Sequence, residues 1–193
     1  MEIRAEEESP RLSLRAKRRL AGAVSLAAIA ALSVLMFVYR DAIASYANAG
    51  YVAVGLVCFA LNAGVFGLSP SGIVAVQASF LFDPLLTALA AGLGAGLGEV
   101  ISYFAGRSSA KVVDVKHADF LRSLSPARLA LVSFAASFLS GNLSDGVGVV
   151  CGRMGKPLAF YLAGAVSAKI AKMVVLVFGA RYLADSLAGF GAL

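Results

Sequence analysis

Two short apolar runs around a polar centre constrain most strongly what this chain of 193 residues can fold into. The runs are Leu129–Leu139 and Val147–Cys151, and neither reaches the roughly 20 residues that a helix needs to cross a bilayer. The pattern predicts a re-entrant hairpin that enters a membrane, turns near its middle at Gly141 and Asn142, and leaves on the same side. Asp145 in this predicted turn is a functional candidate, because ionisable residues inside a membrane mark functional sites.

The composition predicts an integral membrane protein of the all-α polytopic class. Apolar residues make up 60% of the chain and charged residues only 15%, more apolar surface than a soluble domain of this size needs. Cys58 and Cys151 have no CxxC or Cys/His neighbours, so we expect packing roles and no metal site. The only histidine, His117, lies in a loop, and we expect neither an enzyme nor a cofactor.

Charge divides the chain into a basic cytoplasmic head at 1–19, a membrane domain at 20–181 and a short C-terminal interfacial segment at 182–193. The head ends in a basic cluster directly before the apolar run Leu20–Tyr39, which we predict to be the first spanning helix. Because basic residues stay on the cytoplasmic side, the N-terminus is predicted to be cytoplasmic.

A second hairpin is predicted on the outer side. Its arms are Tyr51–Gly67 and Ile73–Phe82, and the turn contains Pro70 and Gly72, which are good turn formers. The two hairpins have opposite orientations, so they predict an inverted repeat that meets at the midplane, an arrangement typical of transporters.

Two further spanning helices are predicted at Pro84–Gly106 and Pro157–Ala180. Alternating glycines in the first allow close helix packing. Four of its residues share one face at helical spacing: Glu99, Ser102, Tyr103 and Gly106. The second carries Lys169, which the helical rise places near the midplane, and Lys172 one turn further on.

The segment Arg107–Arg128 is predicted to be a basic cytoplasmic loop, and Arg153 at the hairpin exit lies on the same side. Asp83 and Arg181 then mark the outer side. Arg107 and Arg153 are interpreted either as interfacial anchors or as parts of a substrate path.

Each charged candidate has a structural alternative. Glu99 could simply pair with Arg107, and Asp145 could cap the second hairpin arm. An unpaired lysine is costly inside a membrane, so we predict that Lys169 interacts with Asp145 while also attracting an anionic headgroup.

Two motifs carry a resemblance to a known family. The first is Gly98-Glu99 with Tyr103-Phe104 and Arg107, and the second runs from Asp145 through Gly148, Cys151-Gly152, Pro157 and Phe160 to Lys169. With these motifs the chain resembles the DedA superfamily, also called the VTT or SNARE-associated domain family, and most of all its vacuole membrane protein branch. It departs from the family at Pro70-Ser-Gly72, which has no acidic residue, and at Gly141-Asn142, where an Asn-Pro is usual.

The resemblance implies a protein that moves lipids between leaflets, as a phospholipid scramblase or a polyprenyl-phosphate flippase. We expect it in a prokaryotic inner membrane. Membrane lipids and protons are the expected partners, nucleic acid is not, and a homo-oligomer stays open. A proton-coupled exporter of small molecules and a membrane scaffold are the alternatives. The predicted substrate or ion path contains seven residues: Glu99, Tyr103, Arg107, Asp145, Arg153, Lys169 and Lys172.

Overall fold

The computed structural model describes residues 47–63, 70–108 and 118–190, together with isolated positions between 27 and 39. Every element in this part of the chain is an α-helix, and it contains no strand, which confirms the predicted all-α class. The basic head at 1–19 lies outside the described residues, as does the predicted Leu20–Tyr39 helix except at those isolated positions.

The described helices are α3 (Ala47–Ala63), α4 (Ser71–Ser79), α5 (Pro84–Gly98), α6 (Val100–Ser108), α7 (Ala118–Ser123), α8 (Pro126–Leu139), α9 (Gly141–Arg153) and α10 (Leu158–Phe190). By length and composition, two stretches could cross a membrane: Pro84–Ser108, which joins α5 and α6, and Leu158–Gly189 in α10. They correspond to the two later predicted spans. However, α10 does not end at Ala180 but continues through Arg181, so no break in the helix separates a C-terminal segment.

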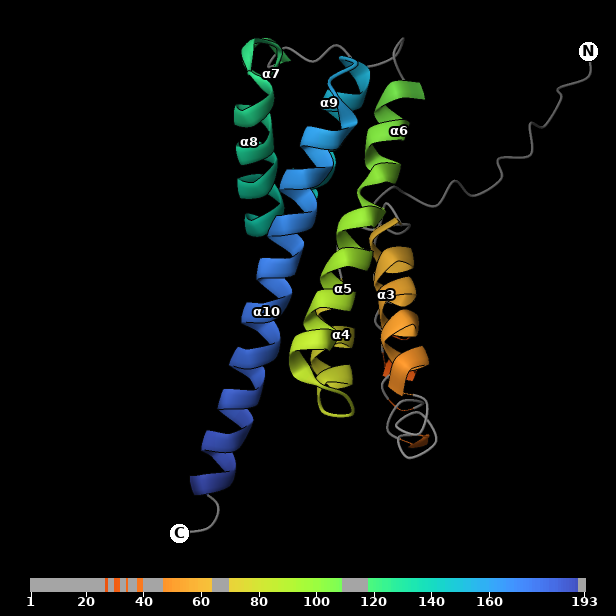
Figure 1. Cartoon of the computed structure of the whole chain (residues 1–193), viewed down its shortest axis with the longest axis vertical. Coiled ribbons are helices and arrows are strands. Elements are labelled where there is room, and N and C mark those ends of the chain that lie inside the picture. The colour runs from red at the N-terminus through yellow and green to blue at the C-terminus, as the bar shows by residue number, and fades with distance from the viewer. Residues whose placement is uncertain are drawn as a thin grey trace, which may run out of the picture.

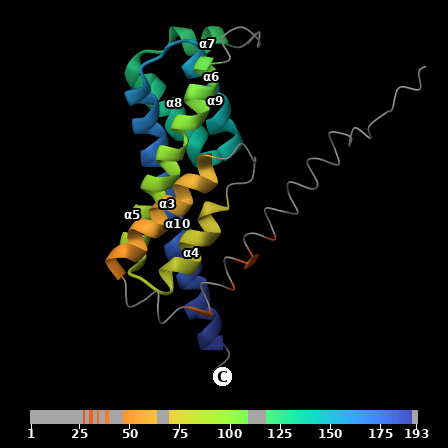
Figure 2. The same ribbon diagram turned by 90° about the vertical axis from the view of Figure 1, so that its right-hand side faces the viewer.

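Two helix pairs occupy opposite ends of the molecule. The α5–α6 stretch and α10 run along its length, with α3 and α4 beside their lower halves and α8 and α9 beside their upper halves (Figures 1 and 2). Helix α3 packs on α5, α8 packs on α10, and α9 packs on α6. Each pair therefore forms a helical hairpin against the two long elements.

The turn of the upper hairpin is shorter than predicted. Helix α8 ends at Leu139 and α9 begins at Gly141, so Ser140 alone connects them. Ser140 has extended backbone angles, φ −155° and ψ 137°, which is sufficient to end one helix and start the next. Gly141 and Asn142 are therefore the first residues of α9, and the prediction that they and Asp145 form the turn was wrong. Packing of α9 against α6 outweighs the weak helix propensity of these residues.

Helices also replace parts of the predicted loop and of the other turn. The predicted loop Arg107–Arg128 contains α7 and the first turn of α8, where Pro126 occupies the first helical position and the Ser125 hydroxyl accepts a hydrogen bond from the Arg128 N–H. In the lower hairpin, Pro70 precedes α4 as its N-cap residue, whereas Gly72 lies inside the helix.

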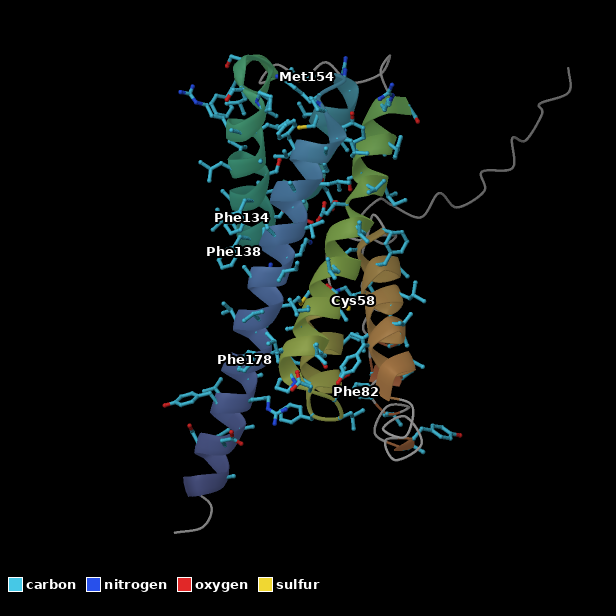
Figure 3. The ribbon with its side chains drawn as sticks, in the orientation of Figure 1. Cys58, Phe82, Phe134, Phe138, Met154 and Phe178 are labelled. Atoms are coloured by element: carbon cyan, nitrogen blue, oxygen red, sulfur yellow. The ribbon has the colours of Figure 1, made fainter. Side chains whose placement is uncertain are left out.

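The interior has two apolar cores. The lower core, between α3, α4, α5 and α10, includes Cys58, Phe82 and Val177. The upper core includes Tyr103, Leu129, Cys151, Tyr161 and Ala165, from α6, α8, α9 and α10. The outer surface is apolar too: Phe138 on α8 and Phe178 on α10 lie on its outer side (Figure 3), and their exposed fractions are 39% and 45%.

The glycines of α5 face two different helices. A Cβ atom on Gly92 or Gly96 would collide with the backbone of α10, and one on Gly94 or Gly98 would collide with the backbone of α3. The predicted small-residue spacing therefore serves close contact with two neighbours at once.

Adding a methyl group at Gly94 should force α5 and α3 apart, because the new Cβ would overlap the carbonyl oxygen of Gly55. We expect Gly94→Ala to lower the free energy of unfolding in detergent by about 1–3 kcal/mol, as overpacking does. Gly146→Ala is the matched control, because its Cβ would have no heavy atom within 4 Å. If both variants melt like the parent, α5 and α3 are not in this close contact.

Candidate functional site: a buried ion pair between the hairpins

A buried ion pair lies where the two halves of the molecule meet. Glu99 occupies the irregular position between α5 and α6, and its exposed fraction is 1%. Lys169 of α10 is 3% exposed, and its Nζ lies 2.8 Å from Glu99 Oε1. Two charges this deeply buried stabilise each other only when further polar groups satisfy their remaining hydrogen-bonding capacity.

Both charges have such further partners. Lys169 Nζ donates to Asn62 Oδ1 on α3 over 3.0 Å, and the Tyr161 hydroxyl on α10 donates to Glu99 Oε2 over 3.2 Å. The Asn62 amide in turn donates to the Cys58 carbonyl over 2.9 Å. The ion pair is thus held by α3, by the α5–α6 junction and by α10.

The hydrogen bonds continue into the upper hairpin. The Tyr161 hydroxyl lies 3.4 Å from the Ser144 carbonyl, and the hydroxyls of Ser144 and Ser137 are 2.5 Å apart. Six residues therefore form one connected group, which we call the polar core: Asn62, Glu99, Ser137, Ser144, Tyr161 and Lys169. It links the hairpin of α3 and α4 to the hairpin of α8 and α9.

Asp145 has a different partner from the predicted one. It is half-buried on α9, and its carboxylate accepts a hydrogen bond of 2.5 Å from the Ser102 hydroxyl of α6. The structure pairs Lys169 with Glu99, so the predicted Asp145–Lys169 interaction was wrong. The physical reason is the packing of α9 on α6, which turns the Asp145 carboxylate to α6, while Lys169 faces α5 and α3.

The alternative pairing of Glu99 with Arg107 is also not what the structure shows. Arg107 lies exposed in the last turn of α6, whereas the Glu99 carboxylate is committed to Lys169 and Tyr161. Nor does Asp145 cap α9, since Ser140 is the N-cap residue of that helix.

The other predicted site residues lie outside the polar core. Tyr103 is buried, and its hydroxyl donates over 2.6 Å to the Lys156 carbonyl in the connection between α9 and α10. Arg153 is the last residue of α9 and half-buried, and its Nη1 atom has no hydrogen-bond partner in the described part of the chain. Lys172 is half-buried on α10, one turn from Lys169.

The motif glycines bring α6, α9 and α10 close enough to build the polar core. Gly148 leaves room for the Tyr161 hydroxyl, and a side chain there would collide with it. Gly152 lies against the Tyr103 carbonyl, and Gly106 lies against the Val149 carbonyl. The predicted face of Glu99, Tyr103 and Gly106 is therefore confirmed as the buried face of the α5–α6 stretch.

Five polar partners were given no role by the sequence analysis: Asn62, Ser102, Ser137, Ser144 and Tyr161. Only Tyr161 had a usable signal. It precedes Lys169 by two helical turns and so lies on the same helix face. Ser102 was placed on the correct face but given no role.

Comparison of the chain with protein-family models, with curated proteins and with solved structures gave no match. The geometry itself defines an all-helical bundle with two opposed helical hairpins and a buried, charged centre. A fixed ion pair of this kind can hold the halves in register and can place polar atoms deep inside an apolar body.

Replacing Lys169 by Met should leave the Glu99 carboxylate buried with only the Tyr161 hydroxyl as partner. Because breaking a buried pair from one side costs about 3–5 kcal/mol, we expect a loss of that size in unfolding free energy. Glu99→Gln combined with Lys169→Met should recover most of it.

Tyr161→Phe is the matched control, because it removes a hydrogen bond and no charge, so its cost should be about 0.5–1.5 kcal/mol. Unfolding free energies of the variants in detergent form a double-mutant cycle. Additive losses from Glu99→Gln and Lys169→Met would show that the two residues are not coupled.

Proposed function

We propose that this chain is an integral membrane protein that moves lipids between leaflets, as a phospholipid scramblase or a polyprenyl-phosphate flippase. The observation that carries the proposal is a buried ion pair at half height between two opposed hairpins of short helices. The resemblance of its two motifs to the DedA superfamily points to the same function.

Charged residues at both ends of the long elements support a membrane position. Asp83 and Arg107 bracket α5–α6, and Lys156 precedes α10, in which Arg181 lies 23 residues after the first helical residue, Leu158. At about 1.5 Å per residue, both intervals come to about 35 Å, which accommodates the roughly 30 Å hydrocarbon core of a bilayer. Lys169 falls near the middle of its interval. Aligned in this way, the ion pair lies near the bilayer midplane.

Three of the four hairpin helices are too short to cross the same distance, and the fourth, α3, has 17 residues. Helices α8 and α9 have 14 and 13 residues, and α4 has 9, whereas a crossing helix needs about 20. Each hairpin would therefore enter from its own side and end near the midplane, as a re-entrant element. The result is an inverted repeat around a central site.

Polar side chains at the midplane end of a re-entrant hairpin lower the free-energy barrier for a lipid headgroup that crosses the membrane. Where the upper hairpin ends, Asn142 is exposed and Asp145 is half-buried, so polar atoms are available at a depth that is otherwise hydrocarbon. A headgroup that crosses here exchanges water for these groups, while its acyl chains stay against the apolar exterior. Movement of this kind needs no nucleotide.

Basic side chains gather at the upper end of the molecule and suggest its orientation. Arg107, Arg128, Arg153 and Lys156 belong to the end of α6, the start of α8 and the connection from α9 to α10. We place this end in the cytoplasm of a prokaryotic cell, with Asp83 and Arg181 outside.

Proteoliposomes with fluorescent phospholipids test this function. Dithionite should bleach dye from both leaflets when the protein is present, and only the outer leaflet of protein-free vesicles. Asp145→Leu removes the acidic side chain near the end of the upper hairpin. It should slow the bleaching of inner-leaflet dye about tenfold, which corresponds to about 1.4 kcal/mol in the barrier to translocation.

Asp185→Leu is the matched control, because Asp185 is an exposed acid near the end of α10. Melting temperatures of both variants must stay near that of the parent. Dye that stays protected in the inner leaflet with the parent protein would rule out lipid translocation and favour an exporter or a scaffold.

A further inference from the structure

Helix α10 carries two lysines near its middle, and they have different surroundings. Lys169 is buried and is bonded to Glu99 and Asn62. Lys172 is half-buried and makes no ion pair or hydrogen bond within the described residues. Lys169, which carries a charge of the same sign, lies one helical turn away. The carboxylate of Asp145 on α9 is bonded to Ser102 of α6.

Lys172 continues a buried stripe of α10. Tyr161, Ala165, Ala168 and Lys172 follow each other at helical spacing and lie along one face. The first three are fully buried, and Tyr161 and Ala165 belong to the upper core with α8 and α9. At Lys172 this stripe first becomes partly exposed.

The upper hairpin ends at the level of Lys172. Helices α8 and α10 both run downwards in Figure 1, and Gly164 lies against Ala130. Leu139, the last residue of α8, is nine residues beyond Ala130, and nine residues beyond Gly164 is Met173. Lys172 therefore lies at the level of the tip of the upper hairpin, one turn above Leu176, where α4 begins to pack on α10.

Apolar side chains follow Lys172 along α10. Val175 and Leu176 lie three and four residues further on, on the same face, and are 61% and 38% exposed, and Leu176 also lies against Gly72 of α4. A cation next to an exposed apolar strip suits an amphiphile: an anionic head at the lysine and an acyl chain along the strip. A free anion would use only the lysine.

In the proposed membrane position, Lys172 lies far from both surfaces of the bilayer. It lies nine residues before Arg181 and 14 residues after Leu158, which corresponds to about 13 Å and 21 Å along the helix. Both distances exceed the reach of a four-carbon side chain. In the membrane position proposed above, its charge is uncompensated, and such charges mark substrate paths.

We propose that Lys172, and not Lys169, binds the headgroup phosphate, and that it makes the protein select lipids with a net negative headgroup. An ammonium group binds phosphate as a flexible point charge and gains little from a zwitterion that brings its own cation. This inference rests on the proposed membrane function, because it uses the same placement of α10. It assigns Lys169 a positioning role and Lys172 the binding role.

Lipid binding is measured first, on the purified protein in detergent. Phosphatidylglycerol should raise the melting temperature of the parent more than phosphatidylcholine does. In Lys172→Gln the apparent affinity for phosphatidylglycerol should fall about tenfold, to that for phosphatidylcholine, which equals about 1.4 kcal/mol. Lys172→Arg should keep the preference. Arg128→Gln removes an exposed charge at the start of α8 and should keep it too.

Transport is measured next with fluorescent forms of both lipids in the dithionite assay. The parent should move phosphatidylglycerol faster, and Lys172→Gln should move the two lipids at equal rates. The assignment would be overturned if the parent bound phosphatidylglycerol no more tightly than phosphatidylcholine. It would also be overturned if Lys172→Gln kept the parent's preference for phosphatidylglycerol. Displacement of phosphatidylglycerol by inorganic phosphate at equal concentration would show a soluble anion as the ligand and would also overturn it.

The two arms separate the failure of this inference from that of the proposed function. Binding that depends on Lys172 without any bleaching of the inner leaflet would refute lipid translocation and support the anionic lipid site. Bleaching that is insensitive to Lys172→Gln would support translocation and refute the site.

Discussion

The ion pair between Glu99 and Lys169 is the interaction on which the rest of the structure depends. Each charge would be strongly unfavourable alone in an apolar interior, so each requires the other to stay in place. Asn62 and Tyr161 complete the hydrogen bonding from α3 and from α10 itself. The pair therefore fixes the register of α10 against the α5–α6 stretch and joins both to α3.

The pair can form only because the helices approach each other closely. Gly92 and Gly96 admit the backbone of α10, and Gly94 and Gly98 admit that of α3. Without these glycines the helices would lie further apart, and the Glu99 carboxylate would not reach the Lys169 ammonium. Small residues and buried charges therefore act together. Dispersion contacts between the closely packed helices stabilise the bundle, and the polar groups fix the register of the helices.

Local patterns predicted much of the fold, and side-chain partners across helices were harder to predict. The two long apolar helical stretches and the glycine spacing of α5 follow from composition and period alone, and both agree with the described structure. The ion-pair partner of Lys169 does not follow from these patterns, because Glu99 and Asp145 are both acids at comparable predicted depth. Which of them faces the lysine depends on how α9 rotates against α6, and sequence period cannot fix that rotation. The turn at Ser140 was misplaced for a related reason, since packing made helix out of residues that favour turns.

The position of the polar core between two apolar cores has a mechanical consequence. Within the described residues, the lower core contains Cys58 and Val177 and the upper core contains Leu129 and Cys151, and they share no residue. Each hairpin is therefore held by its own core, and the bonds of the polar core connect them. The continuous helix α10 also joins the two cores, because it contributes Tyr161 and Ala165 to the upper core and Met173 and Val177 to the lower one. Glu99 also lies at the junction of α5 and α6, where its backbone N–H bonds to the Gly96 carbonyl three residues back, as in a 3₁₀ turn. The same residue thus couples the halves and marks the point where α5 passes into α6.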